Sequence, residues 1–169
     1  MDSGPKPQED YDDLFSGTTP VTDLTKEQAF AILLAAAVRV DLTVQLVEIE
    51  EMLALADRTR TLSKLTEEER RKHCDMAMKS VADPNQIWDA VGNACDKLYQ
   101  LDTRPNELNN PNAPDITVSV FAHACDIIFA DQNVVDVEKK LLQFMAARMK
   151  INPDAAKQIV NLMQKKNMY

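Results

Sequence analysis

The sequence predicts an all-α fold, a single compact bundle of about seven helices. Three Gly among 169 residues are too few for the positive-φ turns of a hairpin-rich β protein. Aromatic residues make up only 5% of the chain, whereas residues that favour helices, such as Ala, Leu, Lys and Glu, are plentiful. Seven segments also carry recognisable helix-start signals. The length suffices for one domain with an ordinary core.

Residues 1–22 are expected to form a disordered acidic leader, and residues 23–169 the helical domain. The leader contains two Gly and three Pro and shows no apolar periodicity, so it has little to bury in a core. Its single Lys faces five acidic residues, which gives the leader a net charge of −4.

Capping residues mark where the first four helices should begin. Thr25 and Gln28 form a capping box, in which each side chain accepts the backbone N–H of the other residue. Thr66 and Glu69 repeat this arrangement, and Asp83 is followed by a first-turn Pro. The four helices are predicted from Thr25 to about Val40, from Thr43 to about Arg60, from Thr66 to about Val81 and from Asp83 to about Leu101.

A loop and three more helices should complete the domain. Residues 103–114 contain three Pro and four Asn and are expected to form a loop. Asp and Asn, which are preferred at helix N-caps, stand before each of the last three apolar segments. These helices are predicted from Asp115 to about Ala130, from Asn133 to about Lys150 and from Asn152 to about Lys165.

The cysteine and motif content argues against several chemistries. Three Cys, with no Cys-x-x-Cys pair, exclude a disulfide framework and disfavour a thiolate zinc site. His123 and Cys125 point apart on one helix, as do the adjacent His73 and Cys74, so the Cys are predicted to be small buried hydrophobes. No Ser-His-Asp grouping, Gly-rich phosphate loop or His-Glu-x-x-His motif is present. We therefore predict that the protein is not an enzyme.

Net charge and hydropathy bear on partners and location. The net charge of −8 argues against nucleic acid as the main partner. The N-terminal segment is acidic and polar, unlike a secretory signal. The longest apolar run, residues 29–38, is about half the length needed to span a membrane. These features argue against a secretory signal and against a membrane span.

The C-terminal part of the chain is basic although the whole is acidic. From residue 139 onward, seven Lys and Arg face one Asp, which gives a net charge of +6. One interpretation is that these are ordinary solvated helix faces. The other is a basic patch that contacts an acidic protein or an anionic membrane surface.

Two similar helix-turn-helix segments stand 90 residues apart. Both read Asp-x-[Thr/Asn]-Val-x-x-x-Glu, at the end of one apolar helix and the start of the next. The first copy runs from Asp41 to Glu48 and the second from Asp131 to Glu138. Two matches of this length predict an internal duplication, with the two units related by a pseudo-twofold axis.

The Glu of each copy should lie inside the apolar face of its helix. It follows the motif Val by four residues, which at 100° per residue places it about 40° from that Val. A partly buried carboxylate is costly without a partner, and the preceding turn offers backbone N–H groups. One interpretation is therefore structural: each Glu clamps the turn between two helices, and each Asp caps it.

The other interpretation of these carboxylates is a cation site. Asp41, Glu48, Asp131 and Glu138 would converge if the two copies pack together, and calcium and magnesium prefer oxygen ligands. Calcium, magnesium or zinc would be the ion. The spacing is not that of an EF-hand, because no Asp-x-Asp-x-Asp-Gly run is present.

The second copy, within residues 125–156, resembles the tellurite-resistance TerB family. The hallmark of that family is roughly Ala-Asp-Gly-x-[Val/Ile]-x-x-x-Glu, followed by a Leu-rich helix and a short final helix. Ala130, Asp131 and Glu138 match this pattern. The first copy matches it through the corresponding Asp and Glu, and Leu42 and Gln132 stand where the family has Gly.

The resemblance covers residues 24–165 and implies a function. It implies an all-helical, non-enzymatic binding module of a cytoplasmic stress-response system, working with other proteins near the inner face of the membrane. It also implies an acidic surface that binds a divalent cation. The alternative is a protein-interaction scaffold without an ion, in which the acidic residues are structural turn clamps.

Overall fold

The computed structural model describes residues 24–40, 49–102, 116–130 and 133–169. Within these ranges the chain forms eight helices and no strand, so the predicted all-α fold is confirmed. The predicted leader, residues 1–22, lies outside the described residues. The helices are α2 (Lys26–Arg39), α3 (Ile49–Asp57), α4 (Arg60–Ser63), α5 (Glu67–Ser80), α6 (Ile87–Asp102), α7 (Ile116–Phe129), α8 (Asp136–Arg148) and α9 (Pro153–Lys166).

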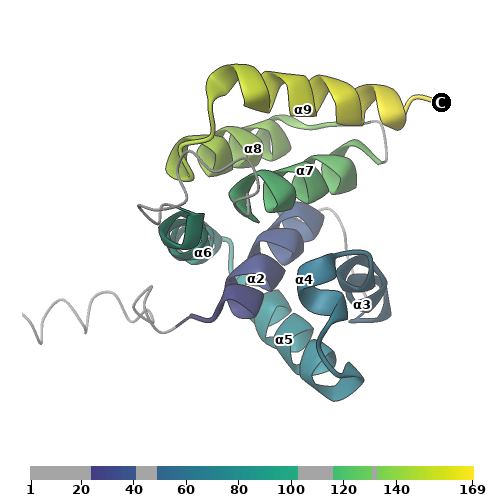
Figure 1. Ribbon diagram of the computed structural model, residues 1–169, viewed down its shortest axis with the longest axis vertical. Coiled ribbons are helices and arrows are strands. Elements are labelled where there is room, and N and C mark those ends of the chain that lie inside the picture. Colours follow the sequence, from purple (N-terminus) through teal and green to yellow (C-terminus); the bar gives the residue numbers. More distant parts are fainter. Residues whose placement is uncertain (1–23, 41–48, 103–115, 131–132) are drawn as a thin grey trace, which may run out of the picture.

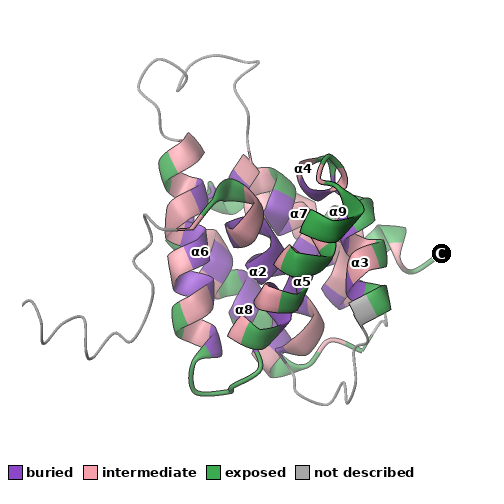
Figure 2. Cartoon of the chain, turned by 90° about the horizontal axis from the view of Figure 1, so that it is seen from below, coloured by how far each residue is buried: buried purple, intermediate pink, exposed green. Residues whose placement is uncertain are grey.

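Helix α2 is the centre of the bundle. All nine residues from 29 to 37 are buried, and the helix packs against α5, α6 and α7 (Figure 1). A helix that is apolar on every side is stable only when neighbours cover every side. Buried residues run along α2 and along the inward faces of the surrounding helices (Figure 2). Helix α9 is the outermost, because it packs on α7 and has no buried residue of its own.

Three predicted helix starts are confirmed by the cap geometry. The Thr25 hydroxyl accepts the N–H of Gln28 at 3.1 Å, and the Gln28 side chain accepts the N–H of Thr25 at 2.9 Å. Thr66 and Glu69 form the same reciprocal pair. Asn152 accepts the N–H of Asp154 at 2.8 Å at the start of α9. These caps depend on residues within three positions of one another, so the sequence pattern suffices to predict them.

The helix predicted from Thr43 to about Arg60 ends three residues earlier than predicted. Helix α3 ends at Asp57, and Thr59 starts the separate helix α4. The Thr59 hydroxyl donates to the carbonyl of Ala56 at 2.8 Å and accepts the N–H of Leu62 at 3.1 Å. One buried hydroxyl thus closes α3 and opens α4. The predicted cap, Thr43, lies outside the described residues.

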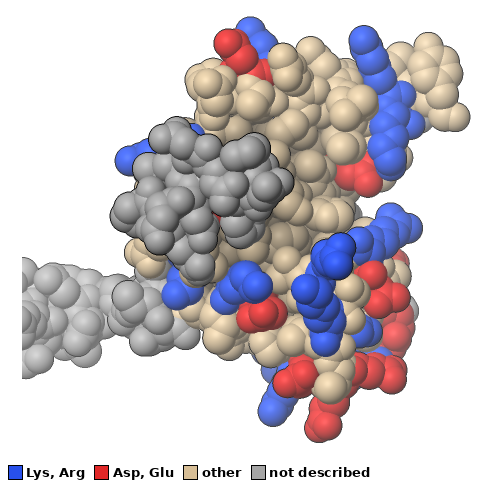
Figure 3. All heavy atoms as spheres, in the orientation of Figure 1, with Lys and Arg blue, Asp and Glu red and all other residues tan. Residues whose placement is uncertain are grey.

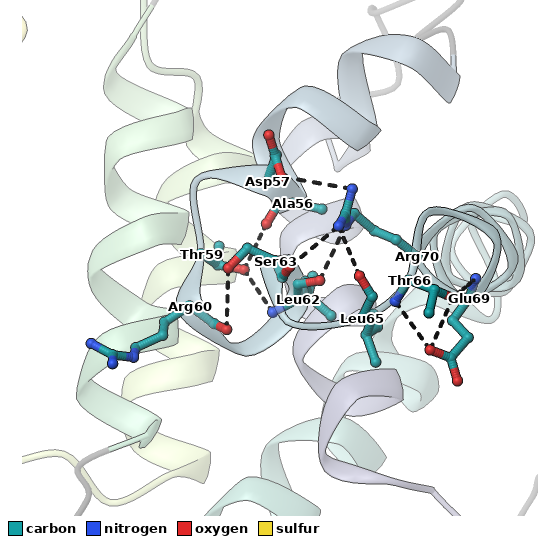
Figure 4. A network of polar contacts seen from close by, with 10 residues as sticks. All are labelled: Ala56, Asp57, Thr59, Arg60, Leu62, Ser63, Leu65, Thr66, Glu69 and Arg70. Atoms are coloured by element: carbon teal, nitrogen blue, oxygen red, sulfur yellow. Dashed lines mark hydrogen bonds and ion pairs between the residues drawn. The ribbon is translucent and has the colours of Figure 1, made fainter.

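Arg70 of α5 holds the end of α4 in place (Figure 4). Its guanidinium donates to the carbonyls of Leu62 at 3.1 Å and Leu65 at 2.9 Å. It also donates to the carbonyl of Ser63 at 3.3 Å and forms an ion pair with Asp57 at 3.6 Å. Carbonyls at a helix C-terminus have few partners within the helix, and Arg70 adds donors for three carbonyls at and just after the end of α4.

One further helix start differs from the prediction, and the predicted cap of another helix lies outside the described residues. Helix α6 begins at Ile87 rather than directly after Asp83, because the carbonyl of Asp83 first closes a turn by accepting the N–H of Gln86 and of Ile87. The predicted cap of α7, Asp115, lies outside the described residues. Asp102, the last residue of α6, accepts the backbone N–H groups of Ile116 at 3.0 Å and Thr117 at 2.9 Å.

Helix α8 also begins and ends inside the predicted range. It starts at Asp136 instead of following Asn133, because Val135 has an extended backbone with φ −94° and ψ 166° and is the last non-helical residue. It ends at Arg148, because Lys150 adopts a left-handed conformation with φ 54°. The N–H of Ile151 then bonds the carbonyl of Ala146 at 2.9 Å, which is the bonding of a Schellman motif.

The two predicted repeat units each contribute a pair of contacting helices. Helix α2 contacts α3, and helix α7 contacts α8. The turn of the first unit, residues 41–48, lies outside the described residues, as do residues 131–132 of the second. The pseudo-twofold relation between the units therefore stays a prediction.

Candidate functional site

Glu138 is the one predicted site residue that the structure describes. It lies in the first turn of α8 and is only 5% exposed. Its Oε1 accepts the backbone N–H of Val135 at 3.0 Å. The burial and the bond to the turn agree with the sequence interpretation in which this Glu clamps the turn. Asp41, Glu48 and Asp131 lie outside the described residues.

The geometry explains why a carboxylate is stable at this buried position. The first N–H groups of a helix have no partner within the helix, and the N-terminus carries a partial positive charge. Val135 at the N-cap has no side-chain acceptor, so Glu138 provides only the returning half of a capping box. The Glu138 carboxylate therefore stabilises the start of α8 whether or not an ion binds beside it.

Within the part of the chain that is described, no group of three or more His, Cys, Asp or Glu side chains is arranged to hold a metal ion. Three of the four predicted ligands lie outside that part. The four-carboxylate cation site, with Asp41, Glu48, Asp131 and Glu138, accordingly stays a prediction.

A small cleft of about 100 Å³ lies next to the C-terminal end of α7. It is bordered by α2, α3, α7 and the end of α9. We call it the Asp126 cleft. Apolar side chains from three helices line part of it, and charged side chains line the rest. Its lining includes Leu34, Leu55, Arg58, His123, Asp126 and Lys166. Ala130, which precedes the motif Asp131, also contributes to the wall.

The polar groups of the cleft form a defined network. Lys166 Nζ donates to Asp126 Oδ1 at 3.0 Å, and Asn167 Nδ2 donates to the same oxygen at 2.9 Å. Burial opposes the ionisation of Asp126, but the bonds from Asn167 and Lys166 outweigh it and hold the pKa of that carboxyl below its usual value. Burial lowers the pKa of His123, and the charge of Asp126 opposes this shift only in part.

The sequence does not predict this cleft. Its residues come from four helices and from the positions that directly follow three of them, and no short motif connects them. From the sequence, His123 is a candidate only for a zinc site, which it cannot form with Cys125. The structure instead places His123 edge-on to Phe30, with ring centroids 6.0 Å apart. Only the packing of α7 between α2 and α9 brings these groups together.

The three cysteines are buried and free, as predicted. Burial raises the pKa of Cys74 to about 11 and the pKa values of Cys95 and Cys125 to about 12. All three thiols are therefore protonated at neutral pH, and a protonated thiol is a poor nucleophile and metal ligand.

The basic C-terminal part of the chain is partly neutralised by ion pairs. Arg148 pairs with Asp96, and Lys166 pairs with Asp126. Lys157 and Lys165 on α9 are exposed, and Leu162 between them is 62% exposed. On the face in Figure 3, charged side chains of both signs crowd the region of α3, α4 and α5, whereas the region of α7 to α9 is largely uncharged.

None of the described helices has the length and apolar character needed to cross a membrane. Comparisons with family models, with curated proteins and with solved structures found no match to this chain.

Proposed function

We propose that this chain is a TerB-like, non-enzymatic binding module of a cytoplasmic stress-response system of the tellurite-resistance type. The observation that supports the proposal is the position of Glu138. The motif predicts an acidic residue inside an apolar helix face next to a turn, and Glu138 is buried there with its carboxylate bonded to the turn. A motif that shapes a helix corner in this way can present neighbouring carboxylates in a fixed arrangement.

A divalent cation is the proposed ligand of the motif carboxylates. The Oε1 of Glu138 accepts the N–H of Val135. Because each carboxylate oxygen has two lone pairs, a carboxylate can accept such bonds and also coordinate an ion. In the sequence, Asp131 directly follows Ala130, which lines the Asp126 cleft. Asp41 and Glu48 would complete the site from the first copy of the motif, with calcium, magnesium or zinc as the ion.

The second candidate is a protein-interaction scaffold without an ion. The position of Glu138 also favours this candidate, because the hydrogen bond from the N–H of Val135 already gives the buried carboxylate a structural role. In this case Asp and Glu of both motifs are turn clamps. The partners would be other proteins of the same stress-response complex.

The exposed part of α9 supports a proposed peripheral contact with the inner face of the membrane. Lys157, Lys165 and the exposed Leu162 lie on the outermost helix of the bundle. Lys side chains are attracted to anionic lipid headgroups, and an exposed Leu can enter the interface.

Isothermal calorimetry with calcium, magnesium and zinc tests the cation proposal. Binding with a defined stoichiometry to the wild-type protein supports it. The matched control is Asp154→Asn, which removes one exposed acidic residue from the first turn of α9 and should leave binding unchanged. Loss of binding in Asp131→Asn together with retention in the control places the ion at the motif. Absence of heat with all three ions favours the scaffold.

A further inference from the structure

The Asp126 cleft carries an excess of positive charge. Arg58 and Lys166 line it, and Asp126 is its one acidic group. Asp126 already accepts hydrogen bonds from Lys166 and Asn167. The Arg58 guanidinium, in contrast, has no hydrogen-bond or ion-pair partner among the described residues. Its charge acts on Asp126 only at longer range, where it helps to lower the pKa of that carboxyl.

The cleft walls also limit what can bind. Leu34, Leu55 and Ile127 provide an apolar surface beside the charged groups. A cavity of about 150 Å³ holds a benzene ring, so the 100 Å³ cleft has room for about four non-hydrogen atoms. A ligand of more than about four non-hydrogen atoms must therefore keep part of its length outside the cleft, with an apolar part against the Leu side chains.

The charge of the cleft favours a carboxylate over other small groups. A cation would be repelled by Arg58 and Lys166. A doubly charged phosphate would face Asp126 and lose hydration against the apolar wall, with only the charge of Arg58 to compensate. A carboxylate carries a single charge and matches the planar fork of a guanidinium with two parallel hydrogen bonds. His123, which burial keeps uncharged near neutral pH, can donate or accept one hydrogen bond beside it.

We infer that the Asp126 cleft binds a carboxylate group on a short apolar body, with Arg58 as its anchor. The source is either a free short-chain carboxylate or the C-terminal carboxylate of a partner protein, which share this chemistry. The site is distinct from the proposed cation site, because none of the four predicted cation ligands is among the cleft residues named here. Either proposal can therefore fail without the other.

An NMR titration of the full chain tests the inference, with sodium butyrate as probe at constant ionic strength. 1-Butanol and butylammonium chloride have the same apolar body with no charge and with the opposite charge. We expect saturable shifts of the amide signals of Leu34, His123 and Ile127 with butyrate only. Shifts of equal size with butanol, or shifts with butyrate that do not saturate, would overturn the inference.

Two variants locate the site, and one control matches them. Arg58→Gln should weaken butyrate binding by about tenfold or more, the effect of losing one charge-assisted interaction. Arg60→Gln removes an exposed Arg two positions away, outside the cleft, and should leave binding unchanged. Asp126→Asn removes the repelling charge and should tighten binding. Unchanged affinity in Arg58→Gln would overturn the inference, and its melting curve verifies that the variant is folded.

A short peptide that ends in Ala-Leu distinguishes the two sources. The peptide with a free C-terminal carboxylate is compared with its amidated form in the same titration. Binding of the free form supports the C-terminus of a partner protein. Binding of butyrate without binding of the peptide supports a free small carboxylate, and failure of both overturns the inference.

Discussion

Arg148 of α8 holds Asp96 of α6 through two parallel hydrogen bonds, although the residues are 52 positions apart. Nε donates to Oδ1 at 2.7 Å and a terminal guanidinium nitrogen donates to Oδ2 at 2.8 Å. The guanidinium also lies over the Phe144 ring, 5.7 Å from its centroid. Gly92 makes room for it, because a Cβ at that position would approach the guanidinium to 2.8 Å.

Loss of this bidentate pair is expected to destabilise the fold modestly. The two side chains are 42% and 34% exposed, so solvent screens the pair, and Arg148→Gln should lower the free energy of unfolding by about 0.5–1 kcal/mol. The matched control is Lys79→Gln, which breaks a more exposed pair within α5 and should cost less than about 0.5 kcal/mol. Urea denaturation measures both. Equal losses in the two variants would show that the bidentate geometry contributes nothing.

Glu138→Ala is expected to lower the free energy of unfolding by about 1–3 kcal/mol. The substitution removes the buried side chain of Glu138 and leaves the N–H of Val135, at the start of α8, without its acceptor. Glu138→Gln keeps an acceptor oxygen and the side-chain volume, so it should lose less. The control is Asp136→Ala, which removes an exposed carboxylate from the same helical turn. An Ala variant of Glu138 as stable as the wild type would mean that its carboxylate is not a clamp.

His123 should make the fold less stable in mildly acidic solution. Burial lowers the pKa of His123 below its ordinary value of 6.5, so the unfolded chain takes up a proton at this residue before the folded chain does. Stability from this residue is therefore present above about pH 6.5 and decreases as the pH falls below it. The pKa of Asp126 is also lowered, so the stability that this residue contributes is lost only as the pH falls to about 3.8 and below.

Urea denaturation between pH 5 and pH 8 measures this effect. The free energy of unfolding should fall on the acidic side in the wild type, and the slope should be smaller in His123→Gln. The same slope in both proteins would assign the pH dependence to other groups.

The proposed membrane contact predicts binding that depends on charge. Vesicles with anionic lipid should bind the protein at low salt and release much of it at physiological salt, where screening shortens the range of the attraction. Lys165→Glu combined with Lys166→Glu should abolish binding. Since Lys166 also pairs with Asp126, the single variant Lys165→Glu is the control for folding. Vesicle flotation measures binding, and equal binding to neutral and anionic vesicles would contradict the proposal.

Local signals explain which parts of the fold the sequence predicts. The caps at Thr25, Thr66 and Asn152 each bond a residue within three positions, so the sequence alone predicts them. The break at Thr59 also uses contacts three positions away, but Leu62 stands where a capping box has Glu or Gln, so the sequence pattern does not mark it. Arg70 of the next helix then bonds carbonyls near the end of α4. The contact from Asp102 to the start of α7 likewise crosses 14 residues of chain.

The same distinction applies to the candidate sites. The buried position of Glu138 follows from helical periodicity and the motif, and the structure confirms it. The Asp126 cleft depends on helices that are far apart in sequence, such as α3 with Leu55 and α9 with Lys166. Periodicity predicts which face of a helix is apolar, but not which other helix meets that face.

The central claim, a divalent cation held by the paired motifs, is tested most directly by the melting temperature in the presence of cations. An ion that binds only the folded chain adds about 2.7 kcal/mol at 100 times its dissociation constant, or a rise of about 5 to 10 °C. We expect this rise with at least one of calcium, magnesium, manganese and zinc, and its loss in Asp131→Asn. Melting curves that none of the four ions shifts at saturating concentration would contradict it.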